Sequence, residues 1–260
     1  MKIKVINPNT TEAMTRSIEE AALLVAETGT TIEAVSPAMG PVSIESHYDE
    51  ALASVGVLDE IRRGEAEGTD AYVIACFGDP GLDAARELTS APVLGIAEAA
   101  FHAASFAGRS FGIVTTLSRT LGRARDLVDA YGFSKLCVSY AACEIPVLAL
   151  EREPLACYRK LEAESKKVLA ESGADSIVLG CAGMAGMCQR LSKALHVPVI
   201  DGVQAAVALS QALVRMNMHT SSVGEFALPP AKPVIGLLQA FTLDGADSLN
   251  NAESLDDADS

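Results

Sequence analysis

Residues 73–88 read VIACFGDPGLDAAREL, an apolar run that ends on Cys76 and then leads into a helical pattern. Residues 176–191 read SIVLGCAGMAGMCQRL and place Cys181 at the same kind of junction. The segments that follow also correspond, since APVLGIAEAA comes after the first stretch and VPVIDGVQAA after the second. This internal similarity indicates a duplicated α/β unit of about 105 residues.

Short apolar runs alternate with helical patterns along the whole chain. The runs are KIKVIN, TIEAVS, AYVIACF and PVLGI in the first half, and SFGIVTT, LCVSYAA, SIVLGC and PVIDG in the second. Strands that alternate with helices form parallel sheets covered on both faces. We therefore predict an α/β fold of two pseudosymmetric Rossmann-like units, each with a parallel four-stranded sheet. We expect residues 1–98 with 207–235 to form the first unit, 99–206 the second, and 236–260 an acidic, disordered tail.

Charge and hydropathy exclude several classes of partner. The chain of 260 residues carries 34 acidic and 20 basic side chains, a formal net charge of −14, whereas phosphate binding needs a basic face. No apolar run approaches the roughly 20 residues that a membrane span requires. The amino terminus, MKIKVIN, enters a strand directly and has no apolar signal segment. We expect a cytoplasmic protein that binds neither nucleic acid nor membranes.

The six cysteines lack the density of a disulfide scaffold, so we expect reduced thiols. The spacing of Cys181, Cys188 and His196 differs from that of zinc motifs, and no GxGxxG sequence opens the first helix. We therefore expect neither a metal nor a nucleotide cofactor. Four of the cysteines fit an ordinary place in the core: Cys137, Cys143, Cys157 and Cys188.

The duplicated cysteines have a chemical interpretation. Ligands of open α/β sheets bind beyond the carboxyl ends of the strands, so two units that face each other would place Cys76 and Cys181 on either side of one ligand. Inverting a carbon beside a carbonyl requires a base on one face and an acid on the other. A thiol can do either, and we expect a helix start after each cysteine to lower its pKa from about 8.5. The alternative is that both thiols are small core hydrophobes.

Polar residues at other strand ends are further candidates for ligand contacts. NPNTT places Asn9 and Thr10 at the start of the first helix, and Thr115 and Thr116 occupy the corresponding place in the second unit. Helix capping alone is an alternative explanation for all four. Gly78, beside the first cysteine, would let the backbone approach a ligand closely and offer an N–H donor.

Taken together, the motifs INPNTT, ACFGDPGL, IVTTL, VLGCAGM and VPVIDGV resemble those of the aspartate/glutamate racemase superfamily, in particular its hydantoin and allantoin racemase branch. The resemblance covers about Lys2 to Leu213. It implies a cofactor-independent racemase that inverts position 5 of a small hydantoin or allantoin substrate, with its site between two units of a homo-oligomeric protein. It assigns catalysis to Cys76 and Cys181. It also implies substrate contacts at Asn9, Ile44 in VSIESHYDEA, Phe77, Gly78, Thr115, Thr116, Ala182 and Gly183.

One departure from the wider superfamily bears on the substrate. Amino-acid racemases of this superfamily follow their first cysteine with Asn-Thr and their second with Thr-His or Thr-Glu, whereas this chain has Phe77-Gly78 and Ala182-Gly183. The polar groups that would hold a carboxylate and an amine are therefore missing, which favours a neutral cyclic amide. Three alternatives stay open: amino-acid racemisation, a maleate-type isomerisation, and a noncatalytic bilobal binder of small molecules.

Overall fold

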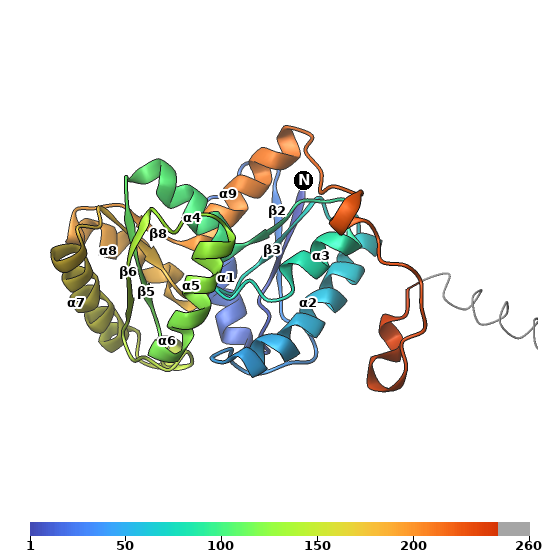
Figure 1. Cartoon of the computed structure of the whole chain (residues 1–260), viewed down its shortest axis with the longest axis horizontal. Helices are drawn as coiled ribbons and strands as arrows, with labels where there is room; N and C mark the ends of the chain where they lie inside the picture. Colours follow the sequence, from blue (N-terminus) through green and yellow to red (C-terminus); the bar gives the residue numbers. More distant parts are fainter. Residues whose placement is uncertain (244–260) are drawn as a thin grey trace, which may run out of the picture.

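The protein is described by a computed structural model over residues 1–243. Two parallel four-stranded sheets have the orders β2-β1-β3-β4 and β6-β5-β7-β8, so equivalent strands hold equivalent positions. The predicted α/β fold of two duplicated units is confirmed, and Figure 1 shows the two sheets in separate lobes. The strands are β1 (Lys2–Ile6), β2 (Thr31–Val35), β3 (Ala71–Ile74), β4 (Val93–Gly95), β5 (Phe111–Thr115), β6 (Cys137–Ala142), β7 (Ser176–Leu179) and β8 (Val199–Ile200).

Helices cover both faces of each sheet. Around the first sheet lie α1 (Glu12–Leu23), α2 (His47–Ala66), α3 (Leu82–Leu88) and α9 (Gly202–Arg215). Around the second lie α4 (Ile96–Ala107), α5 (Leu121–Ala130), α6 (Ala149–Arg152), α7 (Pro154–Ser172) and α8 (Cys188–Leu195). Short 3₁₀ turns are η1 (Ser118–Thr120), η2 (Ala182–Met187), η3 (Gly224–Phe226) and η4 (Gly236–Phe241).

Alternation along the strands explains why helices are needed on both faces. In β1, Ile3 and Val5 are buried in the cluster that contains residues of α1 and α9, while Ile6 joins the opposite cluster with residues of α2 and α3. In β5, Ile113 packs with α4 and α5, whereas Val114 packs with α7 and α8. Side chains on a strand point alternately to the two faces, so each sheet needs two helical layers to bury its apolar residues.

The two units exchange side chains next to the cysteines. Phe77 lies in a core cluster of the second unit, with its ring edge-on to Phe101 at a centroid distance of 5.7 Å. Conversely, Ala182 and Ala185 of η2 lie in a core cluster of the first unit. Each cysteine is therefore followed by a residue that is packed into the other unit. This exchange fixes the two cysteine-bearing loops relative to each other.

Helix α9 returns the chain to the first unit, where it packs against β3, α1 and α4. The assignment of residues 207–235 to that unit stays a prediction, and α9 begins at Gly202, within the range 99–206 that we expected in the second unit. Part of the expected tail, residues 236–241, forms η4, and residues 244–260 lie outside the described part of the chain. Within residues 1–243, no helix combines the length and hydropathy that spanning a membrane requires.

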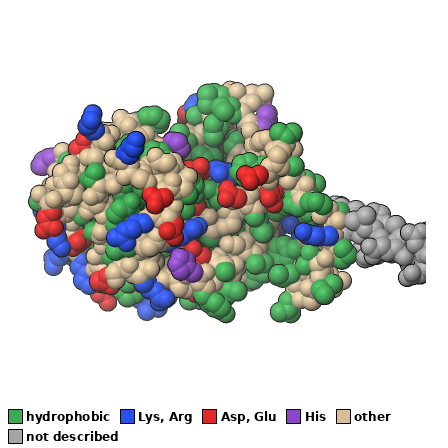
Figure 2. Space-filling model, viewed as in Figure 1, with side chains coloured by type: hydrophobic (Ala, Val, Ile, Leu, Met, Phe, Trp, Pro, Cys, Tyr) green, Lys and Arg blue, Asp and Glu red, His purple; other side chains and the backbone are tan. Residues whose placement is uncertain are grey.

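Charged side chains are mixed on the surface. On the described part of the face drawn in Figure 2, Lys and Arg side chains are scattered and lie among Asp and Glu side chains. That face thus offers no continuous basic surface of the kind that phosphate binding requires.

Gly202 provides a test of the close contact between α9 and α4. A Cβ atom at this position would lie 2.5 Å from the carbonyl oxygen of Ile96 at the start of α4. We expect Gly202→Ala to lower the free energy of unfolding by about 1–3 kcal/mol, because two backbones would have to separate. Chemical denaturation measures the change. Gly122→Ala in α5 is the control: its Cβ would meet nothing within 4 Å, so a comparable loss there would contradict this explanation.

Candidate active site

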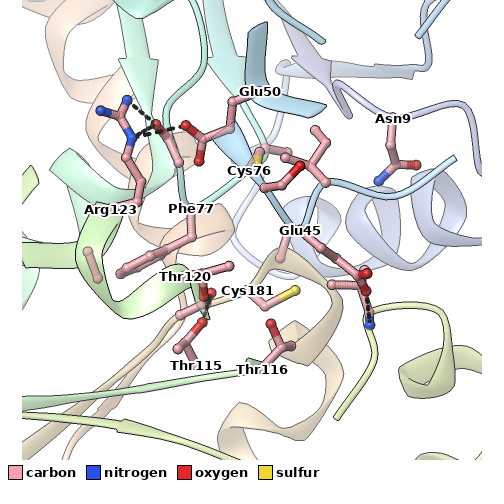
Figure 3. A pocket seen from close by; sticks show the side chains of 18 of the residues that line it. Asn9, Glu45, Glu50, Cys76, Phe77, Thr115, Thr116, Thr120, Arg123 and Cys181 are labelled. Carbon is pink, nitrogen blue, oxygen red and sulfur yellow. Dashed lines mark hydrogen bonds and ion pairs between the residues drawn. The ribbon is translucent and has the colours of Figure 1, made fainter. Parts of the chain in front are cut away.

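Both cysteines line one pocket at the carboxyl ends of the central strands. Cys76 follows β3 and Cys181 follows β7, and the pocket, about 630 Å³ including its open mouth, contains both. Each sheet order reverses direction beside these strands, and such a switch point is where open α/β sheets bind ligands. Figure 3 shows the two cysteines approaching the pocket from different elements. The geometry expected from the duplication is therefore present.

The same backbone turn holds each thiol. In the Cys76 turn (residues 76–79), the Asp79 N–H donates to the Cys76 carbonyl at 2.9 Å. In the Cys181 turn (residues 181–184), the Met184 N–H donates to the Cys181 carbonyl at 3.1 Å. In each turn, the backbone N–H of the glycine two residues after the cysteine, Gly78 or Gly183, lowers the pKa of the thiol, because an N–H near the sulfur favours the thiolate.

The expectation that a following helix lowers both thiol pKa values is wrong for this geometry. Burial raises the pKa of the Cys181 thiol to about 11, and it raises the pKa of the Cys76 thiol further. The N–H bonds from Gly78 and Gly183 oppose this effect but are weaker than desolvation. Helix α3 begins only at Leu82, and Cys181 is followed by the 3₁₀ turn η2, so neither thiol lies at the start of an α-helix.

The polar residues at the carboxyl ends of β1 and β5 are partly used by the fold. The side-chain oxygen of Asn9 accepts the Thr11 N–H at 2.9 Å, and its amide nitrogen lies 3.1 Å from the Met14 sulfur. Thr11 occupies the N-cap position of α1, although its side chain makes no capping hydrogen bond, so Thr10 is not the capping residue that we expected. In the second unit, the Thr115 hydroxyl donates to the Gly180 carbonyl at 2.9 Å. Asn9 keeps a second amide N–H, and this group and the Thr116 hydroxyl, which both belong to residues that line the pocket, can contact a ligand.

Three charged residues line the pocket that sequence reasoning did not single out: Glu45, Glu50 and Arg123. Glu45 accepts the Val147 N–H at 2.7 Å and so joins the two units. Glu50 lies in the first turn of α2, with an oxygen 3.3 Å from the Arg123 Nε. Burial raises the pKa of the Glu50 carboxyl, and the nearby Arg123 opposes that rise.

Nearly all of the predicted site residues reach the pocket. Gly183 and Thr10 are the exceptions: Gly183 lies beside Leu150, and Thr10 donates its N–H to the Pro41 carbonyl at 3.0 Å. The nine that line the pocket are Asn9, Ile44, Cys76, Phe77, Gly78, Thr115, Thr116, Cys181 and Ala182.

The sequence contains a local signal for Glu50, one of the three charged pocket residues that sequence reasoning did not single out. Ser46 and Asp49 form a capping box, in which the Ser46 oxygen accepts the Asp49 N–H at 3.2 Å and its hydroxyl donates to the Asp49 carboxylate at 2.8 Å. This pattern predicts a helix start and puts Glu50 in its first turn. For Arg123 the signal is weaker: a cation in the first turn of a helix is unfavourable there, so another partner must hold it.

Comparisons with known proteins point to one family. Residues 3–210 match the Asp/Glu/hydantoin racemase family. A hydantoin racemase of Pseudomonas sp. strain NS671 is 49% identical over 241 residues, which cover 93% of this chain and 97% of that protein. An allantoin racemase structure from Klebsiella pneumoniae is 50% identical, with a TM-score of 0.91 and coverage of 93% and 99%. One from Pseudomonas fluorescens is 37% identical, with a TM-score of 0.88 and coverage of 91% and 100%.

Proposed function

Since the chain belongs to the Asp/Glu/hydantoin racemase family, we propose that it racemises hydantoins by proton transfer between Cys76 and Cys181, without a cofactor. The substrates are 5-substituted hydantoins, including allantoin. The observation that carries the proposal is the pair of thiols, held in equivalent turns, that line one pocket from two units. Two such groups are what inversion at a carbon acid needs.

In the proposed reaction, one cysteine acts as a thiolate and removes the proton from ring carbon 5. The electron pair of that C–H bond moves into the ring and gives an enolate at the adjacent carbonyl. The other cysteine, still a thiol, donates its proton to the opposite face of the same carbon. The product is the mirror image of the substrate, and the two sulfurs have exchanged protonation states. Asn9 and Thr116 are the groups we propose to bind the enolate oxygen.

The charges in the pocket support a neutral substrate. Its wall carries two carboxylates, Glu45 and Glu50, and one guanidinium, Arg123, which is already engaged by Glu50 and a backbone carbonyl. A substrate carboxylate would meet this net negative wall and be repelled. A hydantoin has no ionised carboxylate and presents amide N–H and carbonyl groups instead.

Circular dichroism of enantiopure substrates tests the proposed function. Purified protein without added cofactor or metal is incubated with allantoin and, separately, with 5-benzylhydantoin, beside buffer controls that correct for spontaneous racemisation. The proposal predicts decay of the signal to zero, faster than in the controls. Racemisation only of aspartate or glutamate, or isomerisation of maleate followed by ultraviolet absorbance, would point to another reaction of the superfamily. Binding of hydantoins without acceleration would indicate a noncatalytic binder.

The raised thiol pKa values predict how racemisation depends on pH. A group with a raised pKa stays protonated up to a higher pH, so both thiols are mainly neutral at pH 7, whereas the reaction needs one thiolate. We expect kcat/KM, which reports the free enzyme, to rise roughly tenfold per pH unit between about pH 7 and 9. Initial rates corrected for buffer-only racemisation measure this dependence. A profile that is flat or falls over this range would contradict the assigned thiol chemistry.

The cytoplasmic location and the homo-oligomeric assembly expected from the sequence stay predictions. So does the absence of a metal or cofactor from the reaction. A racemisation assay after extensive dialysis against a chelator, with activity retained, is the outcome expected for the cofactor-independent mechanism.

A further inference from the structure

The two cysteine turns share the same backbone hydrogen bond, from the third residue after the cysteine to the cysteine carbonyl, but are supported differently. The Cys181 turn continues directly into η2, which packs against α1, so regular structure follows the thiol. No α-helix follows the Cys76 turn until Leu82, and Asp79 within it has a left-handed φ of 45°. A non-glycine residue in this region is held there by its surroundings. Side chains from elsewhere must therefore fix the Cys76 turn.

Arg123 of α5 is hydrogen-bonded to a backbone carbonyl of the Cys76 turn. Its Nε and Nη2 donate to the Gly78 carbonyl at 3.1 and 2.6 Å, so both arms of the guanidinium converge on one oxygen. Figure 3 shows the same guanidinium linked to Glu50 of α2, whose Oε2 lies 3.3 Å from the Arg123 Nε. This fork cannot be reproduced by a single ammonium group.

Glu50 and Gly78 fit against each other closely. A Cβ on Gly78 would lie 2.4 Å from the Glu50 Oε1, so the carboxylate occupies the space that a larger residue would need. The side chains of Glu50 and Arg123 are 17% and 31% exposed, which means that the pair is only partly hydrated. An arginine in the first turn of α5 is also disfavoured by the helix dipole, so its place is not explained by the stability of that helix.

A second anchor reaches the turn from Tyr131, the residue that follows α5. The Tyr131 hydroxyl donates to an Asp79 oxygen at 2.9 Å, and the Asp79 carboxylate also accepts the Ala97 and Glu98 N–H groups, both at 3.0 Å. The Asp79 side chain therefore ties the end of the turn to α4 and α5. Arg123 holds the preceding residue, Gly78, whose N–H lowers the pKa of the Cys76 thiol.

From these contacts we propose that Arg123, oriented by Glu50, is a positioning residue for Cys76: it fixes the Gly78 carbonyl and thereby holds the turn that carries the Cys76 thiol and the Gly78 N–H. The effect of Arg123 on catalysis that we infer rests on the proposed function. Arg123 does not act on the substrate in this account. Among the described residues, no side chain is hydrogen-bonded to the Gly183 carbonyl, so the role is specific to one of the two thiols.

Alkylation of the two thiols tests this role without relying on turnover. Wild-type protein and Arg123→Gln are treated with iodoacetamide at pH 8, and the labelling rates of Cys76 and Cys181 are followed by peptide mass spectrometry. We expect Arg123→Gln to slow labelling of Cys76 about tenfold relative to Cys181, since one N–H bond to the thiolate is worth about one pKa unit. Racemase kcat/KM should fall by about 10- to 100-fold.

Two further variants keep the test decisive. Arg125→Gln, on the same helix but stacked on Tyr140, should leave both labelling rates unchanged. Arg123→Lys retains the charge without the fork, so it should slow Cys76 labelling as well, and it replaces Arg123→Gln if that variant fails to fold. Equal effects on both cysteines, no effect, or faster labelling of Cys76 would overturn the inference. The expected labelling change in a protein that never racemises hydantoins would instead defeat the proposed function.

Discussion

Cys76→Ser and Cys181→Ser are each expected to lower the rate of hydantoin racemisation by about 10³-fold or more. A serine hydroxyl keeps the size and polarity of the side chain but ionises far less readily than a thiol, so it cannot replace the base or the acid. General acid–base groups typically contribute about 10²- to 10⁴-fold, and here each turnover needs both. Loss of the circular dichroism signal of an enantiopure hydantoin measures the rate.

Cys188→Ser is the matched control for these two variants. Cys188 lies outside the pocket and its thiol donates to the Val199 carbonyl, a bond that a serine hydroxyl can also make. We expect its racemisation rate to stay within about twofold of wild type, because the thiol takes no part in proton transfer. Wild-type turnover by either Cys76→Ser or Cys181→Ser would contradict the two-thiol assignment. A variant that retains one thiol is expected to exchange the carbon-5 proton of one enantiomer only.

Gly180→Ala is expected to give the second-largest effect, a loss of activity of about 10²-fold. The Gly180 N–H donates to the Val114 carbonyl, and the Gly180 carbonyl accepts the Thr115 hydroxyl, both at 2.9 Å. These two hydrogen bonds fix Gly180 against β5. A Cβ here would lie 2.6 Å from the Thr115 Cβ and 2.9 Å from its Cα. The clash must displace either the adjoining Cys181 or the end of β5. A displacement of about 1 Å is enough for such a loss of activity.

Chemical denaturation and the racemisation assay separate the two consequences of Gly180→Ala. Overpacking at this contact is expected to lower the free energy of unfolding by about 1–3 kcal/mol. Gly186→Ala, in the η2 turn that follows Cys181, is the control, because a Cβ there would meet nothing within 4 Å. A Gly180→Ala protein with wild-type activity would show that the position of Cys181 tolerates movement that this mechanism does not allow.

The fold and the two thiols could be predicted from sequence because their signals are local and occur twice. Alternating apolar runs and helices specify parallel sheets, and a strand end marks the edge where a ligand binds. Cys76 and Cys181 occupy equivalent strand ends, so duplication alone placed them in one site. Family resemblance added Ile44, which has no chemical signal of its own and does line the pocket.

What could not be predicted depends on how the two units meet. Glu50 lies in the first turn of a helix of the first unit, and Arg123 lies in the first turn of a helix of the second. Nothing within either segment indicates that their side chains touch. The thiol pKa values depend on burial, which outweighs the local N–H bonds. A helix start directly after Cys76 was expected, but Pro80 and the left-handed Asp79 delay α3 to Leu82.

Isotope incorporation during early turnover tests the central claim, that opposed thiols act on the two faces of carbon 5. One enantiomer of 5-benzylhydantoin is incubated with the protein in deuterium oxide, and substrate and product are separated on a chiral column at less than about 10% conversion. With an acid that has exchanged with solvent on one face and a base on the other, the product should carry deuterium from the first turnovers while the recovered substrate stays protiated. Equal deuterium content in the two enantiomers at this stage, after correction for buffer-only exchange, would mean that a single group serves both faces.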